Sequence, residues 1–391
     1  MYKRQVNITL FILNLTGVLP ALWIGSLVLY GAIYSYQYLR LRDLFSEAQH
    51  LAVNLNKFRR VLVFLEAFPY REDALTQLAR PFWNSEQRPS RVLKHIARLA
   101  SAASLQNNEF AWFLLNALVP WDFYFAYRLD GFKRRLSDLL PRWLDAWYEL
   151  EAFNSLANFA YLNPGYVFPV IELQVDGRSG PVFEAREAGH PLIPYENRVC
   201  NDFSVPELGQ VTIVTGSNMS GKSTFLRTLG VNLALTYTGG VACAAGLRTI
   251  PFRLFTTIQV SDSLNDGISY FYAEVRRLRA LLDELQRSHR YPLFFLIDEI
   301  FRGTNNLERQ IGSQSYVQSL VGSRGTGVIS THDLELVHLA DEFDEVRNFH
   351  FREEVEGDRM VFDYRLRPGP SPTTNALKIM QLEGLPVRPR A

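Results

Sequence analysis

The chain has 391 residues, with 41 basic and 40 acidic side chains and a formal net charge of +1. This length gives room for two or three domains with a substantial core, and the near balance of charge means that composition alone does not indicate a nucleic-acid-binding protein. Two cysteines, Cys200 and Cys243, are too few for a disulfide framework, which fits a reducing compartment.

The N-terminal region is the compositional outlier of the chain. Residues 6–39 carry no charge and are mostly Leu, Ile, Val, aromatic and small residues. A membrane-spanning helix needs about 20 apolar residues, so this run is long enough for one tilted or kinked span, with Pro20 at the kink. Tyrosines near its C-terminal end, followed by two arginines, are typical of an interface that faces the cytoplasm. We therefore predict a transmembrane segment in residues 1–42; the alternative is a buried helix of a larger core.

A helical domain is predicted for residues 43–165. Stretches such as DLFSEAQHLAVNLNKFRRVLVFLEAF and PRWLDAWYELEAFNSLANFA place apolar residues three and four positions apart. The run LNPGYVFPVIELQVDGRSG is rich in Pro and Gly, which indicates a domain boundary, and residues 166–391 are predicted as a second domain. Four prolines are expected to separate individual helices: Pro69, Pro81, Pro120 and Pro141.

The second domain alternates short apolar runs with helical ones. VTIVTG, LFFLIDE and TGVISTH read as strands, and each is followed by a loop with polar residues. This order indicates an α/β domain with a mostly parallel sheet, in which the functional loops lie at the carboxyl ends of the strands. The expected architecture is this α/β domain after an all-α helical domain and an N-terminal hydrophobic helix.

The first of these strands leads into TGSNMSGKSTFL, which has the spacing of a phosphate-binding loop, Gly-x-x-x-x-Gly-Lys-Ser. Gly216 and Gly221 allow backbone N–H groups to turn toward the phosphates of a nucleotide. Lys222 adds a full positive charge, and Ser223 offers a hydroxyl to Mg²⁺. The fold class is therefore an α/β P-loop domain. Its expected nucleotide-binding residues are Gly216, Ser217, Asn218, Met219, Ser220, Gly221, Lys222, Ser223 and Thr224.

Three other segments carry polar residues at chemically useful positions. Asp298 and Glu299 follow the strand LFFLI; in a P-loop ATPase the aspartate holds Mg²⁺, and the glutamate orients or deprotonates the attacking water. Two solvated acids at a strand end are the alternative. His332 ends the strand GVISTH, from where it could hydrogen-bond the terminal phosphate. Gly267 and Ser269 precede a long charged helix, an arrangement able to bind an anion.

These four elements, in this order, resemble the nucleotide domain of the MutS mismatch-repair family, which belongs to the ABC-type ATPases. TGSNMSGKST resembles the family's TGPNMGGKST, and DSLNDGISYFYAEV resembles DDLxxGxSTFMxEM, which places Ser269 and Glu274 at family positions. DEIFRGTNNLER resembles DEIGRGTSxxDG, with Phe301 as a departure, and STHD is similar to the family's THY loop. The resemblance covers roughly residues 146–385.

The resemblance implies an enzyme that hydrolyses ATP with Mg²⁺. It also implies a homodimer with composite sites, in which Ser269 of one subunit caps the nucleotide held by the other. Upstream, EAGHPLIPYENRVCNDFSV resembles the approach to the family's ATPase domain and places Arg198 near the position where the family stacks an aromatic ring on adenine. The implied site residues are Glu299, His332 and Lys222 for catalysis, and Ser223 and Asp298 for the metal.

DNA binding is a further implication of the family, although its mismatch-reading domain, with a Phe-x-Glu wedge, has no counterpart here. Phe45-Ser-Glu47 and Phe64-Leu-Glu66 match the letters, but both lie in helical, apolar contexts and are rejected as wedges. Three basic clusters are candidate contacts to DNA, although such clusters are more often solvated helix faces, and the first of them could equally meet anionic lipid. They are Lys57–Arg60, Arg88–Arg98 and Lys133–Arg135.

Two functions follow as alternatives. The first is an ATP-hydrolysing MutS-type protein whose dimer closes on mismatched or branched DNA. The second is a switch of a membrane-anchored, MutS-related subgroup, which acts on a protein or lipid partner without DNA. Both place the ATPase domain in the cytoplasm. A sensor without hydrolysis is disfavoured by the presence of Lys222, Asp298, Glu299 and His332. The chain ends about where the family's helix-turn-helix dimer element would begin, which also fits a fragment of a longer protein.

Overall fold

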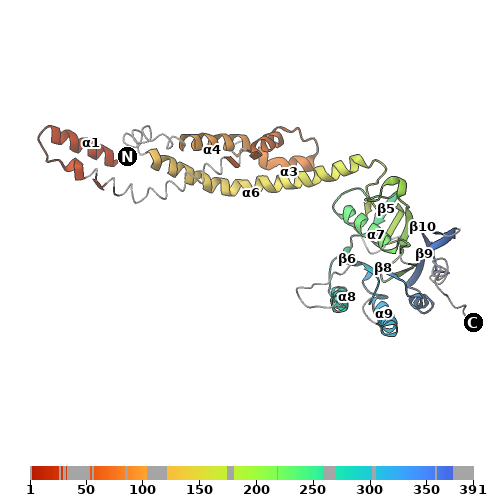
Figure 1. The fold of residues 1–391 in the computed structure, drawn as a ribbon. Coiled ribbons are helices and arrows are strands. Elements are labelled where there is room, and N and C mark those ends of the chain that lie inside the picture. The colour runs from red at the N-terminus through yellow and green to blue at the C-terminus, as the bar shows by residue number, and fades with distance from the viewer. Residues whose placement is uncertain are drawn as a thin grey trace, which may run out of the picture. The chain divides into compact units, whose positions relative to one another are not determined.

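The chain divides into two compact units, residues 1–154 and 155–391 (Figure 1). The predicted boundaries after residues 42 and 165 stay predictions. The computed structural model of the protein describes residues 2–25, 28–29, 32, 53–54, 57–83, 87–103, 121–173, 180–217, 219–258, 270–301, 305–356 and 359–372.

The N-terminal residues form a helix, after which the chain reverses direction and packs against it. Helix α1 (Tyr2–Leu15) ends before Gly17, which has a positive φ of 71° and is soon followed by Pro20. The rings of Phe11 and Trp23 then lie 5.4 Å apart, with the Trp23 indole N–H donating to Asn14 Oδ1 at 3.3 Å. Along a continuous helix these rings would be about 18 Å apart. The prediction of one span kinked at Pro20 is therefore wrong, because glycine and proline end the helix here instead of bending it.

A membrane-spanning helix is not found in the described part of the chain. No helix there is both long and apolar enough to cross a bilayer. Most of the second half of the predicted segment, from residue 26 to residue 39, lies outside the described residues.

The first unit has an aromatic core of its own. Trp143 and Phe82 are fully buried within it, and the Trp143 indole N–H donates to the carbonyl of Pro81 at 3.2 Å. Pro81 and Pro141 lie inside helices, so the prediction that they separate helices is wrong, whereas Pro69 does lie between helical segments. The elements are a helical segment over 57–67, α3 (Asp73–Trp83), α4 (Pro89–Ala103) and α6 (Trp121–Leu162).

The second unit is built on a six-stranded sheet in the order β10-β9-β4-β8-β7-β6. All neighbouring strands are parallel except β10, which returns antiparallel to β9. The predicted mostly parallel α/β fold is therefore confirmed. The strands are β4 (Val211–Thr215), β6 (Arg253–Thr257), β7 (Leu293–Asp298), β8 (Gly325–Thr331), β9 (Val346–Glu356) and β10 (Arg359–Pro368), and the helices are α7 (Lys222–Tyr237), α8 (Tyr270–Gln286) and α9 (Asn306–Leu320).

Both faces of this sheet are buried, because successive residues of a strand point to opposite faces. Val214 and Leu296 pack on the face covered by α7. Ile213 and Ile297 pack on the other face, in the core that includes side chains of α8 and α9. The continuous apolar runs of the sequence thus become strands with helices on both sides, and their polar ends meet at one edge.

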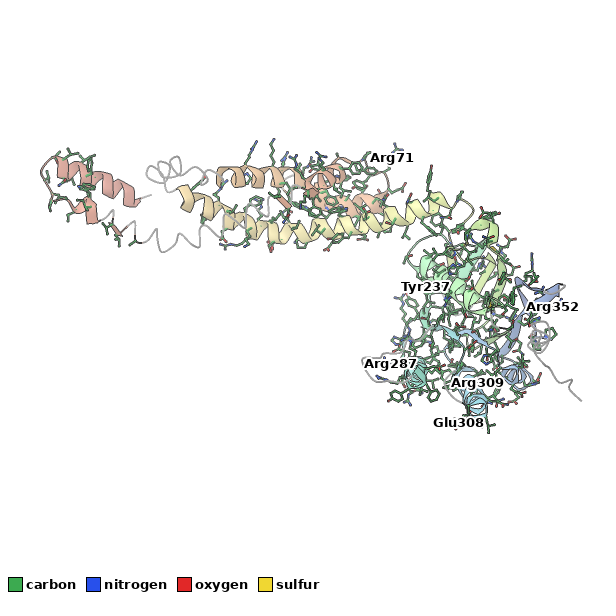
Figure 2. The ribbon with its side chains drawn as sticks, in the orientation of Figure 1. Arg71, Tyr237, Arg287, Glu308, Arg309 and Arg352 are labelled. Atoms are coloured by element: carbon green, nitrogen blue, oxygen red, sulfur yellow. The ribbon has the colours of Figure 1, made fainter. Side chains whose placement is uncertain are left out.

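A smaller sheet, in the order β1-β5-β2-β3, shares the core of α7. Tyr237, the last residue of α7, is labelled in Figure 2 and hydrogen-bonds the segment between β5 of this sheet and β6 of the larger one. Its hydroxyl donates to Ile250 O at 2.8 Å and accepts from Phe252 N at 3.0 Å, and burial raises its pKa. The strands are β1 (Val170–Ile171), β2 (Phe183–Ala188), β3 (Asn201–Val205) and β5 (Gly246–Thr249), and short helices follow β2 (η2, Tyr195–Asn197) and β8 (η3, Leu334–His338; α10, Leu339–Glu342).

Candidate nucleotide site

The loop between β4 and α7 has a backbone that only glycine fits at its start. Gly216 has a φ of 148°, and a Cβ there would lie 2.7 Å from Ser220 Oγ and 2.8 Å from Phe351 O. Gly221, with a φ of 107°, brings the chain into the first residue of α7. The N–H groups that begin α7 have no partners within the helix, so they and the helix dipole favour an anion at this end. Both glycines therefore have the positive φ that this turn requires.

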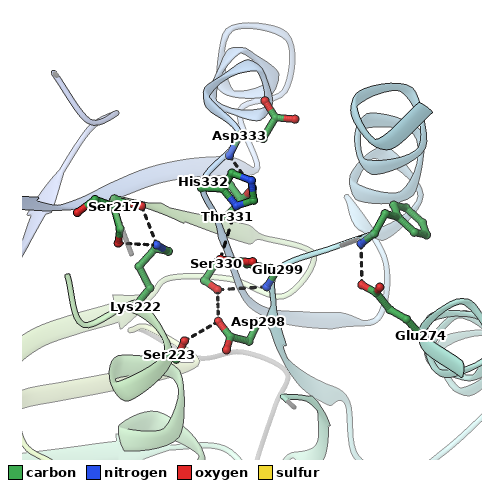
Figure 3. Close-up of polar contacts among 12 residues, drawn as sticks. Ser217, Lys222, Ser223, Glu274, Asp298, Glu299, Ser330, Thr331, His332 and Asp333 are labelled. Carbon is green, nitrogen blue, oxygen red and sulfur yellow. Dashed lines mark hydrogen bonds and ion pairs between the residues drawn. The ribbon is translucent and has the colours of Figure 1, made fainter. Parts of the chain in front are cut away.

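Lys222 is drawn into the loop that it follows. Its side chain is only 5% exposed, and its Nζ donates to Gly216 O at 2.6 Å and Ser217 O at 2.8 Å (Figure 3). The hydroxyl of Ser217 donates to the buried carboxylate of Glu353, on β9, at 2.9 Å. The loop is therefore held from inside by a lysine and from β9 by an acid that the sequence reading missed.

The residues predicted to hold a magnesium ion, Ser223 and Asp298, lie together at the end of β7. Ser223 Oγ donates to Asp298 Oδ1 at 2.9 Å, and the buried Ser330 Oγ donates to the same oxygen at 2.5 Å (Figure 3). Mg²⁺ prefers a few oxygen ligands and completes its shell with water and phosphate. A hydroxyl and a carboxylate beside a phosphate loop fit that preference. No cluster of three or more His, Cys, Asp or Glu side chains suited to a metal occurs among the residues that the structure describes.

Glu299 is placed by the end of the neighbouring strand β8. Its N–H donates to Ser330 O at 3.0 Å, with Ser330 Oγ at 3.3 Å, and its φ is 58°, a conformation that non-glycine residues seldom adopt. His332 Nδ1 lies 3.6 Å from Glu299 Oε1. The predicted acid and histidine therefore meet at the carboxyl edge of the sheet, beside Lys222.

Lys222, Ser223 and Glu299 line a cavity of about 760 Å³, whereas Asp298 and His332 are not among its lining residues. Its wall includes predicted residues of the loop, among them Ser217, Met219 and Thr224, together with Glu299. The volume is in the range of small-molecule sites. The cavity also has lining residues that the sequence reading missed, and these are Ala188, His190, Ile193, Asn197, Val199, Asn201, Phe225, Thr228, Phe351 and Tyr364.

Tyr364 is the most exposed aromatic side chain of that wall, at 44%. It lies at an irregularity in the pairing of β10 with β9 and has a φ of 54°. Asn201 clamps the chain there, donating to Tyr364 O at 3.0 Å and accepting from Leu366 N at 2.7 Å. A tyrosine in an antiparallel strand far from the loop carries no motif, so its place in the cavity cannot be read from sequence.

Arg198 does not line the cavity. Its guanidinium donates to Ile193 O, at 2.6 Å from Nη2, and to Cys243 Sγ at 3.0 Å, and it lies over the ring of Tyr166 at 5.4 Å. Its contacts are those of an arginine that fixes the loop before β3. Two predicted residues, Asn218 and Ser269, fall outside the described residues.

His190 is a titratable residue of the cavity wall. Burial lowers the pKa of its imidazole, and the positive charges of Arg227 and Arg198 lower it further. The ring is thus favoured in its neutral form, which suits a wall that faces an uncharged group.

Comparisons with known proteins point to the same domain. Residues 212–389 match the family model for MutS domain V. The chain is 30% identical over 226 residues to a DNA mismatch repair protein MutS of Exiguobacterium, 56% of this chain and 26% of that protein. It is 28% identical over 243 residues to the DNA mismatch repair protein MutS of Natronomonas pharaonis, 61% of this chain and 27% of that protein.

A third relative is the DNA mismatch repair protein MutS 2 of Halobacterium salinarum, 28% identical over 264 residues, 66% of this chain and 29% of that protein. The chain thus spans less than a third of the length of these relatives. The match to domain V begins within β4 and includes the phosphate loop, Asp298, Glu299 and His332. Together these findings show that residues 212–389 are similar to MutS domain V.

Proposed function

We propose that the second unit binds ATP with Mg²⁺ and hydrolyses it to ADP and phosphate. The observation that carries the proposal is one 760 Å³ cavity at the carboxyl edge of the parallel sheet, which is lined by Lys222, Ser223 and Glu299, with Asp298 hydrogen-bonded to Ser223. Charge stabilisation and positioning provide most of the catalysis of phosphoryl transfer. Lys222, the pair Ser223 and Asp298, and the acid Glu299 directly after β7 are suited to those needs.

Each residue has a role in this scheme. The loop N–H groups and Lys222 hold the phosphates, and Ser223 and Asp298 hold Mg²⁺, which neutralises charge on the phosphate oxygens when bound. Glu299 orients the attacking water and accepts its proton. His332, 3.6 Å from Glu299, donates a hydrogen bond to the terminal phosphate. Asp298 and Glu299 are consecutive residues at the end of β7.

The base of the nucleotide is assigned to the wall formed by Tyr364 and His190. Tyr364 presents an exposed ring beside Gly221, where a Cβ on that glycine would lie 3.2 Å from the tyrosine Cδ1. A flat, partly exposed ring at this position is suited to stacking on a base. This assignment replaces Arg198, whose guanidinium is held by Ile193 O and Cys243.

A homodimer with composite sites remains part of the proposal. Met219, on the phosphate loop, is 82% exposed, and Leu192 and Tyr195 flank the cavity residue Ile193 with similar exposure. Large apolar side chains gathered beside a polar cavity support a protein surface that covers them. If Ser269 completes the partner's site, ATP turnover per chain rises with protein concentration until dimers saturate. The composite site is contradicted if turnover per chain stays constant over a concentration range in which the dimer dissociates.

DNA is the proposed partner of the first unit. Two basic clusters that are separate in the sequence come together there, in a groove of about 690 Å³ between α4 and α6. An anionic backbone is the ligand that such a groove favours, since each phosphate neutralised releases a counterion. The lining side chains include Arg91 and His95 of α4 and Arg128, Arg134 and Arg135 of α6.

DNA dependence of ATP turnover tests this function and separates it from the alternative. A MutS-type protein coupled to DNA shows turnover that changes when duplex, mismatched or branched DNA is added at low salt, and loses the effect as salt rises. Turnover that no DNA structure alters, with no DNA retained on a filter, leaves the switch that acts on a protein or lipid partner. Free Cys200 and Cys243 are compatible with the predicted cytoplasmic location.

A further inference from the structure

Glu274 is a buried acid that no step of the proposed reaction uses. It lies in the first turns of α8, is 1% exposed, and its Oε1 accepts a hydrogen bond from the backbone N–H of Phe301 at 2.6 Å (Figure 3). Burying a carboxylate is unfavourable unless its oxygens are bonded. The contact that satisfies it is with the loop two residues after Glu299, so this acid is bonded to the catalytic loop.

The loop that it holds has an unfavourable backbone. Glu299 and Phe301 both have a φ of 58°, and neither is glycine. Left-handed conformations of non-glycine residues persist only where surrounding contacts enforce them. Ile300, between them, is buried in the core below the sheet. Glu299 and Phe301 therefore depend on surrounding contacts to keep this conformation.

The side chain of Phe301 supplies the second of those contacts. Its ring centroid lies 6.2 Å from that of Phe271 on α8 and 6.3 Å from that of Tyr316 on α9. A Cβ on Gly312 of α9 would come within 3.3 Å of the ring, so the absence of a side chain there makes room for it. The ring therefore packs against both helices, while its backbone N–H is bonded to Glu274.

We infer that Glu274 and Phe301 are positioning residues that hold Glu299 in its hydrolytic position and couple it to α8. The inference rests on the proposed role of Glu299. Glu274 fixes the backbone at residue 301, and Phe271 with Tyr316 fixes its ring. Because Phe271 and Glu274 lie in the first turns of α8, directly after the segment that carries Ser269, a shift of that end of α8 changes the conformation of the catalytic loop.

The test compares two substitutions of Glu274 in the full chain. Glu274→Gln keeps an acceptor for the Phe301 N–H, whereas Glu274→Ala removes it. We expect kcat to fall about 10- to 100-fold in Glu274→Ala, with the Kd for a fluorescent ATP analogue within about twofold of the wild-type value, and Glu274→Gln to restore most of kcat. The matched control is Glu284→Ala on the same helix, whose carboxylate pairs with Arg253 instead of the loop.

Hydrogen exchange separates this inference from the proposed function. Glu274→Ala should speed amide exchange in the peptide that contains residues 299–301, and Phe301→Leu should do so to a lesser degree, whereas Glu284→Ala should not. Faster exchange with unchanged kcat overturns the positioning role, and unchanged exchange overturns the link itself. A wild-type chain that turns over ATP no faster than Glu299→Gln refutes the proposed function instead, while the exchange result still decides whether Glu274 holds the loop.

Discussion

Ser330 contacts both Asp298, the acid proposed to bind the metal, and Glu299, the acid proposed to act in catalysis. It is fully buried at the end of β8, donates to Asp298 Oδ1 at 2.5 Å and lies 3.3 Å from the N–H of Glu299. Ser330→Ala deletes both contacts but leaves the β8 backbone, so the N–H of Glu299 keeps its bond to the carbonyl of residue 330. The change therefore acts mainly on the orientation of the Asp298 carboxylate.

The size of the effect follows from the contacts. A hydrogen bond to a charged group contributes about 1.5–3 kcal/mol, and removing a group that orients a metal ligand weakens metal binding about 10- to 100-fold. Ser223 still donates to the same oxygen at 2.9 Å and holds part of the orientation. We therefore expect the lower end, an apparent Mg²⁺ affinity about tenfold weaker in Ser330→Ala.

The assay is a titration of ATP turnover with Mg²⁺ at fixed ATP, with metal-free nucleotide binding measured in parallel. Ser330→Ala should need about ten times more Mg²⁺ for half-maximal turnover, while binding of the nucleotide without metal stays the same. Ser319→Ala, which removes a partly buried hydroxyl bonded to Tyr316 O at 2.6 Å, is the matched control. A Ser330→Ala enzyme with the wild-type Mg²⁺ requirement would refute the reasoning.

Two further predictions concern the base and the partner. Tyr364→Ala should weaken ATP binding about tenfold, since stacking on a base contributes about 1–3 kcal/mol, and should leave binding of inorganic tripolyphosphate unchanged; equal losses for both ligands would remove Tyr364 from the base site. Reversing charge in the groove with Arg128→Glu and Arg135→Glu should weaken DNA retention at low salt and flatten its dependence on salt concentration. The same reversal at the exposed Arg71 and Arg80, which lie outside the three basic clusters, serves as the control, and equal losses in both variants would argue against a groove-specific contact.

The cavity's core could be placed from sequence because the chemistry sits at the ends of apolar strands. The carboxyl ends of parallel strands share one edge of a sheet, so the residues after β4, β7 and β8 meet whatever the lengths of the helices between them. Lys222, Asp298, Glu299 and His332 are brought together in this way. Ser330 could be predicted by the same argument, because it lies in β8 two residues before His332.

Other parts of the site depend on tertiary contacts that leave no local pattern. Tyr364 enters the cavity through an irregularity in an antiparallel strand, and Glu353 reaches Ser217 across the sheet from β9. The family resemblance places Arg198 near a stacking position, but its guanidinium is held by Cys243 and Ile193. The pairing register of β9 and β10 decides such contacts, and this register cannot be read from a single sequence.

The N-terminal error has a different cause. Hydropathy over residues 6–39 counts apolar side chains and is insensitive to chain reversal. Gly17, with its positive φ, and Pro20 after it are the residues that end α1 and return the chain. Gly17 and Pro20 are a local sequence signal for this turn, whereas the length of the apolar run alone predicts a span.

ATP turnover by the wild-type chain and by Glu299→Gln, measured together with ATP binding, tests the central claim most directly. The substitution keeps the shape of the side chain but removes the carboxylate that accepts a proton from water. We predict that the wild-type chain hydrolyses ATP with Mg²⁺ and that Glu299→Gln binds ATP with similar affinity while turnover falls at least about 100-fold. Equal turnover by the two proteins would contradict the assignment of this cavity as an ATPase site.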